Sequence, residues 1–155
     1  MAKIDTDQDL RQALEGLSAA QQRRLGCTFA EHLQHLIRDE RLHRAIATGL
    51  RETITPGELE DAYRAAKAYA VKSYTDCGKD TDWMAQADHF VAAATAAALT
   101  PDDMLTDKQN RAWKAAVNAR MAVTCAMMED DTASETDEAR HQHRIASAFL
   151  QSALG

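Results

Sequence analysis

Apolar residues recur along this chain at intervals of three and four, which is the spacing of one face of an α-helix. The clearest run comprises Leu25, Phe29, Leu33 and Leu36, and a similar run follows over residues 42–50. No segment alternates apolar and polar residues as a half-buried strand does. The pattern therefore predicts an all-α protein.

Capping residues mark where several helices begin. Thr55 and Pro56, with Glu58 three residues after the threonine, have the pattern of a capping box with proline at the first helical position. This pattern predicts a helix over about 56–76. A second Thr-Pro pair, at positions 100–101, repeats the device before a short turn that leads into a further helix.

The segment Cys77–Phe90 is dense in cysteine, aspartate, tryptophan and histidine side chains, which suggests a metal or catalytic site. Helix ends account for the same residues. Gly78 is suited to ending the preceding helix, and Asp80 or Thr81 to capping the next one. Asp82 would then lie in the positive first turn of that helix. A calcium loop does not fit, because alanine stands where an EF-hand has its bidentate glutamate.

These signals together predict one domain over residues 1–155, with about six main helices after a short N-terminal arm or helix in residues 1–17. The expected helices run over about 6–16, 19–37, 39–51, 56–76, 82–98, 107–129 and 135–153. The six main helices pair as three hairpins, over about 19–51, 56–98 and 107–153. The hairpins form either an orthogonal bundle or a short helical-repeat stack, and a faint repeat of Ala62–Ala66 at Ala112–Ala116 suggests the stack.

The charge of the chain argues against a nucleic-acid ligand. Its net charge is -6 and its pI is near 5.5, whereas affinity for phosphates depends on clustered lysine and arginine. Residues 53–106 carry nine acidic and only four basic side chains. Residues 56–103 are therefore expected to present an acidic face.

The apolar runs are too short to cross a bilayer, which takes about 18 or more consecutive apolar residues. The N-terminus has no apolar run behind its lysine. Three cysteines about fifty residues apart match neither a disulfide framework nor a zinc finger. We expect a cytoplasmic protein with no membrane association and no cofactor.

A metal centre is the sharpest chemical alternative. Two Glu-x-x-His patterns occur, Glu40 with His43 and Glu138 with His141. Di-iron helical bundles use two such pairs, which face inward from different helices. Both glutamates fall on the apolar arcs of their helices, but no further helix offers an inward carboxylate at matching height.

A second polar cluster comprises His32, His35, Asp39 and His43, spaced three, four and four residues apart. If the chain stays helical through residues 38–41, these side chains share one face that can bind Zn²⁺ or Ni²⁺. We interpret them as a solvated polar side of the helix.

Arg120 is the most informative charged residue, because it falls on an apolar face of helix 107–129 that includes Trp113. A guanidinium there must pair with a carboxylate, carbonyl groups or an anionic ligand. Glu138 and Gln142 face inward on the following helix and are the expected structural partners. If neither satisfies it, Arg120 with Gln142 and Trp113 forms a ligand or partner site.

No sequence motif supports catalysis: there is no nucleophile elbow, phosphate-binding glycine loop or dinucleotide fingerprint. The favoured interpretation is a non-catalytic helical module, such as an adaptor, inhibitor or complex subunit. It would bind a protein partner through a groove between helices or through the acidic face. The alternatives are a metal-binding helical enzyme or sensor and an acidic inhibitor that imitates nucleic acid. Helix 107–129, with its wide apolar arc, is either central or forms a homodimer interface.

Overall fold

The computed structural model describes residues 3–74, 81–106, 109–129 and 135–154 of the chain. Within these ranges all regular secondary structure is helical, which confirms the predicted all-α fold. The elements are α1 (Asp7–Glu15), α2 (Ala19–Glu31), the 3-10 turn η1 (Gln34–Leu36), α3 (Glu40–Leu50), α4 (Pro56–Ser73), α5 (Trp83–Leu99), the 3-10 turn η2 (Asp102–Met104), α6 (Arg111–Glu129) and α7 (Glu135–Leu154). None of the helices in these ranges combines the length and the apolar character that a bilayer span requires.

The expected helix start at Thr55 is confirmed. Its hydroxyl accepts a hydrogen bond from the Glu58 N–H at 3.1 Å, and the Glu58 carboxylate accepts one from the Thr55 N–H at 2.9 Å. Pro56 occupies the first helical position, where its missing N–H costs nothing. For α5 the capping prediction was wrong by one or two residues, because Asp82 itself is the N-cap and accepts from the Ala85 N–H. Gly78 and Asp80 lie outside the described residues.

The predicted continuous helix from 19 to 37 was also wrong, because α2 ends at Glu31 and the chain is extended at Ile37. Two hydrogen bonds, one local and one between distant residues, favour an interruption before α3. Asp39 accepts a hydrogen bond from the Arg41 N–H and so caps α3, and the Arg38 N–H donates to the buried Asp88 of α5. Because residues 38–41 are not one helical stretch, the expected single face from His32 to His43 does not form.

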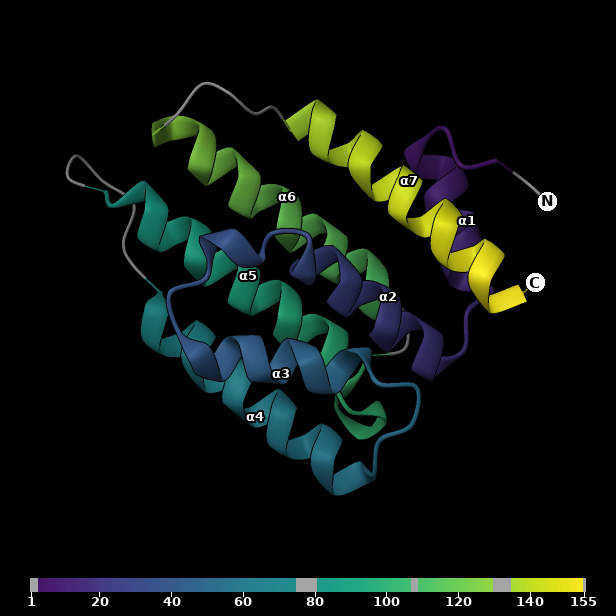
Figure 1. Ribbon diagram of the computed structural model, residues 1–155, viewed down its shortest axis with the longest axis horizontal. Helices are drawn as coiled ribbons and strands as arrows, with labels where there is room; N and C mark the ends of the chain where they lie inside the picture. The colour runs from purple at the N-terminus through teal and green to yellow at the C-terminus, as the bar shows by residue number, and fades with distance from the viewer. Residues whose placement is uncertain (1–2, 75–80, 107–108, 130–134, 155) are drawn as a thin grey trace.

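Helices α4, α5 and α6 lie side by side, and α2 and α3 cross one face of this layer (Figure 1). Helix α5 is central, since it packs against α2, α3, α4 and α6. Its most extensive contact is with α6, a helix of a different predicted hairpin. Helix α7 lies beside α6 and α2, with α1 next to it. The helices therefore form a compact bundle whose principal contacts cross the boundaries of the predicted hairpins.

Small residues let the helices at the centre approach closely. A Cβ atom added to Gly26 of α2 would lie 2.7 Å from the Cβ of Ala98 on α5, which is closer than real contacts allow. A Cβ added to Gly49 of α3 would collide with the sulfur of Cys27. That thiol is fully buried, and burial raises its pKa to about 12. Cys27 is therefore a packing residue rather than a nucleophile.

A second, smaller apolar cluster attaches the ends of the chain to the bundle. It joins α1, α2, α6 and α7, and its fully buried side chains include Leu10, Leu14, Leu25, Phe29 and Ala146. Partly buried residues of the last turns of α7, Ile145, Phe149 and Leu150, pack against it. The C-terminal half of α7 is thus held by apolar contacts, whereas its first turns meet the bundle through polar groups.

Candidate functional site

The face of α5 that α2 and α3 leave uncovered forms the floor of a groove of about 610 Å³. Its walls are α4 and α6, and η2 with the following residues closes one end. Alanines make most of the floor. The lining residues on the three helices are Tyr63, Lys67, Ala70, Val71, Tyr74, His89, Ala93, Ala96, Ala97, Lys114 and Asn118.

Apolar side chains along this groove are exposed to solvent. Val71 and Tyr74 of α4 are 67% and 65% exposed, and Met104 at the closed end is 55% exposed. On α6, Val117 and Met121 are also exposed, and each follows a lining residue, Lys114 or Asn118, by three positions and so lies on the same side of the helix. Single exposed apolar residues are common, but several along one depression indicate a binding surface.

The charges in the groove are basic although the protein is acidic overall. Lys67 lies on the α4 wall and Lys114 on the α6 wall, and the described lining contains no aspartate or glutamate. His89 is held in place between the walls, since its Nδ1 lies 3.2 Å from the Ser73 hydroxyl and its ring meets that of Tyr74 edge-on. The groove therefore combines an apolar floor with cationic groups on both sides.

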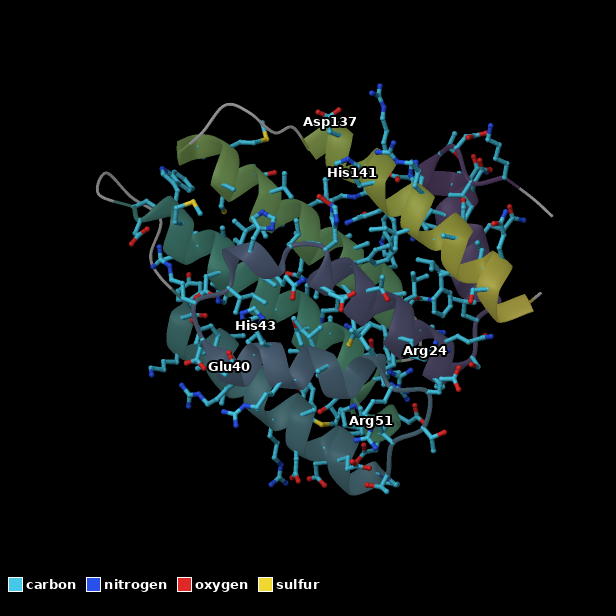
Figure 2. All side chains as sticks on the ribbon, viewed as in Figure 1. Arg24, Glu40, His43, Arg51, Asp137 and His141 are labelled. Atoms are coloured by element: carbon cyan, nitrogen blue, oxygen red, sulfur yellow. The ribbon has the colours of Figure 1, made fainter. Side chains whose placement is uncertain are left out.

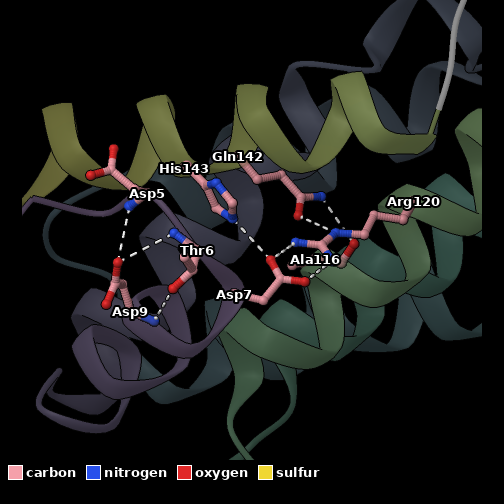
Figure 3. A network of polar contacts seen from close by, with 8 residues as sticks. All are labelled: Asp5, Thr6, Asp7, Asp9, Ala116, Arg120, Gln142 and His143. Atoms are coloured by element: carbon pink, nitrogen blue, oxygen red, sulfur yellow. Dashed lines mark hydrogen bonds and ion pairs between the residues drawn. The ribbon is translucent and has the colours of Figure 1, made fainter.

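Arg120, the predicted site residue, lies at the centre of a polar network between α1, α6 and α7 (Figure 3). Its Nη1 and Nη2 donate to the two carboxylate oxygens of Asp7 at 2.7 and 2.8 Å. Its Nε donates to Oε1 of the Gln142 side chain at 2.8 Å. His143 Nε2 lies 2.9 Å from Asp7 Oδ1, and Gln142 also donates to the Ala116 carbonyl. Every member of this network has a partner.

The guanidinium of Arg120 also lies over Trp113, with its Cζ 5.4 Å from the ring centroid. The hydrogen bonds of Arg120 hold the pKa of Asp7 well below its usual range, with a further contribution from His143. The expected bond from Arg120 to Gln142 is confirmed. The sequence did not predict the principal partner of Arg120. That partner, Asp7, lies 113 residues away in the sequence, and only the tertiary fold brings it close.

Glu138 has no such partner, although only 4% of it is exposed. Its Oε1 accepts no hydrogen bond, and the nearest basic group recorded is His32 Nε2 at 3.6 Å. The ring of His141 lies edge-on to that of His32, with centroids 5.1 Å apart. One ligand atom from each of these three residues lies within 4.8 Å of the others. We call this group the His32–Glu138–His141 cluster.

The other Glu-x-x-His pair lies elsewhere. Glu40 is exposed at the start of α3 and His43 is one turn further along, whereas His141 projects from the first half of α7 (Figure 2). The four residues of the two pairs are therefore not assembled into one centre. Glu138 and His141 are brought together with His32, which the sequence had assigned to a different face.

The acidic side chains of residues 56–103 are largely paired. Glu58 bonds Arg51 at 2.6 Å, Glu60 bonds Arg64, and Asp82 approaches Arg38. Asp88 is buried and accepts hydrogen bonds from the Tyr69 hydroxyl and the Arg38 N–H. Arginines interleaved with the carboxylates interrupt the negative surface that imitation of nucleic acid would require.

A wider cleft of about 740 Å³ lies between the N-terminal ends of α2 and α4 and η2. Two buried arginines reach it, and their recorded bonds go to the protein itself. Arg23 bonds the carbonyls that end α3, at Gly49, Arg51 and Glu52, and Arg111 bonds the Thr100 carbonyl and Asp102. These contacts give both cations a structural role at helix ends and turns.

Comparisons with protein-family models, curated proteins and solved structures found no match to this chain.

Proposed function

We infer that this protein is a helical binding module whose groove between α4, α5 and α6 accepts an amphipathic, acidic helix of a partner protein. The observation that supports this most directly is the groove itself, with its alanine floor and exposed apolar edges. Binding of a helix in a groove places apolar residues at helical spacing against such a floor.

The extent of the apolar surface favours a helix over a small ligand. A cavity of about 610 Å³ suits a small molecule. However, the exposed apolar residues continue beyond it along α6, from Val117 to Met121 and then to Met128. Eleven residues of helix extend about 16 Å, which is a distance that three turns of a partner helix match.

The charge of the groove indicates the charge of the partner. Lys67 and Lys114 stand on opposite walls, so a helix lying between them gains by carrying acidic residues along both of its edges. Such rim charges contribute mainly to association rate and specificity. The apolar face of the partner supplies the buried area.

The test uses a designed peptide as the probe. A 14-residue amphipathic helix with leucines at i, i+3, i+4 and i+7 and glutamates beside them is titrated into the full chain, and binding is followed by fluorescence anisotropy. We expect saturable binding that Ala93→Leu weakens at least about tenfold, because the added side chain fills the groove floor. A peptide with lysines in place of the glutamates should bind more weakly.

Matched charge variants locate the binding surface. Lys67→Glu with Lys114→Glu should weaken binding of the acidic peptide, whereas Lys72→Glu, an exposed α4 residue outside the groove, should not. If Lys72→Glu weakened binding of the acidic peptide as much as the groove substitutions do, the inference would be overturned. The remaining outcome is a homodimer in which α6 of a second copy covers this face. Light scattering would then give the molar mass of a dimer for wild type and of a monomer for Met121→Lys.

A further inference from the structure

The His32–Glu138–His141 cluster lies away from the groove and contains the one buried carboxylate of the described chain for which no hydrogen bond is recorded. Buried polar atoms are almost always hydrogen-bonded, and an unsatisfied buried acceptor costs roughly 1–3 kcal/mol, or more if charged. Asp88 shows the usual solution in this same protein: it is 3% exposed and both of its oxygens accept hydrogen bonds. Glu138 therefore lacks a partner that its environment requires.

Neighbouring protein cations do not supply that partner. Arg120 acts on Glu138 only through its electrostatic field, since its donors are directed to Asp7 and Gln142. The 3.6 Å separation from His32 Nε2 is that of an ion pair. That distance is too long for a hydrogen bond, so His32 leaves the Glu138 Oε1 unbonded.

We propose that His32, Glu138 and His141 bind a divalent transition-metal ion, with Zn²⁺ as the reference ion. Two neutral imidazole nitrogens and one carboxylate oxygen are a donor set that suits Zn²⁺ and related ions rather than Ca²⁺ or Mg²⁺. This use of the cluster is separate from the proposed groove function.

The geometry is close to what such an ion needs. Ligand bonds of about 2.1 Å in a tetrahedron place ligand atoms about 3.4 Å apart. The His32–Glu138 distance is 3.6 Å, and the widest spacing in the cluster is within 4.8 Å. Small rotations of the two partly exposed histidines would complete the approach. The same exposure leaves a path for the ion and a fourth position for water.

The elements explain how the site is built. Glu138 and His141 are three residues apart on α7 and so share one face, and His32 is the residue at which α2 ends. His32 itself keeps helical backbone angles and its N–H donates to the Thr28 carbonyl, so the last turn of α2, which packs against α7, places this side chain beside Glu138 and His141. The ion would link α2 to the first turns of α7, the part of that helix that has few apolar contacts with the bundle.

The experiment uses the full chain without a histidine tag, stripped of metal with a chelator and then titrated with Zn²⁺ by calorimetry and with Co²⁺ by visible absorption. We expect one ion per chain and the visible bands of Co²⁺ in a four-coordinate site. His32→Ala, Glu138→Gln and His141→Ala should each weaken binding by at least the roughly 10–100-fold that loss of an outer-shell partner costs.

The matched control is the other pair, Glu40→Gln with His43→Ala, which should leave the affinity unchanged. Circular dichroism establishes that each variant is folded, and His32→Ala, at a helix end, is the least disruptive of the three. Substoichiometric binding, or an affinity that all three cluster variants retain, would overturn the proposal. Peptide binding to the groove is expected to persist without metal, so this result and the groove result can fail independently.

Discussion

Two polar clusters meet the first half of α7, and they differ in how completely their groups are bonded. The network around Arg120 joins Asp7, Gln142 and His143, and each of these side chains has at least one hydrogen-bond partner. The His32–Glu138–His141 cluster begins one turn earlier on α7 and contains an unbonded buried oxygen. Polar groups that satisfy one another hold the fold together, whereas a buried group without a partner costs stability and indicates a place for a ligand.

The largest expected effect on stability comes from removing Arg120 from its hydrogen-bonded network. Arg120→Leu removes three hydrogen bonds, leaves the side-chain oxygen of the fully buried Gln142 without its donor, and leaves the Asp7 carboxylate with His143 alone. We expect a loss of about 2–4 kcal/mol in the free energy of unfolding, measured by urea denaturation. Arg11→Leu is the matched control, because Arg11 lies over the same Trp113 ring but is exposed, and it should cost less than about 0.5 kcal/mol. Similar losses for the two variants would show that the network contributes nothing beyond the ring contact.

Substitution in the His32–Glu138–His141 cluster should raise the free energy of unfolding rather than lower it. In metal-free protein, Glu138→Gln replaces a buried carboxylate with a neutral amide of the same shape, and we expect a gain of about 1–2 kcal/mol. For a domain of this size, each 1 kcal/mol corresponds to about 2–4 °C in Tm. Scanning calorimetry of wild type and variant measures the difference in Tm. Glu40→Gln, at an exposed position, is the control and should leave the Tm unchanged. With Zn²⁺ added, the order of the two Tm values should reverse.

A smaller effect follows from pH. Asp7 has a folded-state pKa below its ordinary value of 3.8, chiefly because of its hydrogen bonds to Arg120. Its contribution to stability is therefore present above about pH 4 and is lost as the pH falls through the lowered pKa. Because Asp7 is 46% exposed, solvent screening limits this contribution to about 1 kcal/mol.

Asp7→Asn measures that contribution directly. The variant should be less stable than wild type at pH 7, and the difference should begin to shrink below pH 4, where the unfolded wild-type chain binds a proton that the folded state does not. Urea denaturation at pH 7, 5 and 3 gives the three differences. A difference that stays constant down to pH 3 would show that the stabilisation comes from shape rather than from the ionised carboxylate.

Local sequence signals predicted the helices better than their ends. Thr55 and Glu58 form their capping box within four residues, so the start of α4 could be found from the sequence. The end of α2 could not, because a helix through residues 32–37 satisfies the apolar spacing equally well. The extended segment that follows it is held by a bond from the Arg38 N–H to Asp88, a residue 50 positions away.

The candidate site was predicted in part for the same reason. Helical spacing placed Glu138 and His141 on one face, and Arg120 opposite Gln142, since those relations lie within a helix or between neighbours. The third member, His32, depends on how α7 packs against α2, and the partner of Arg120 depends on where α1 docks. Both are tertiary facts, and a periodic pattern carries no information about them.

The alanine-rich centre of the bundle has a consequence for the entropy of folding. Fully buried positions on α5 and α6 include Ala87, Ala94, Ala98, Ala115 and Ala119. Alanine has no side-chain rotamers to lose, so ordering these positions costs almost no side-chain entropy. Each also contributes little apolar area. The centre of this protein therefore has few alternative packings, and its net stability depends on the larger buried side chains, such as Phe29, Leu42 and Leu99, and on the polar networks between helices.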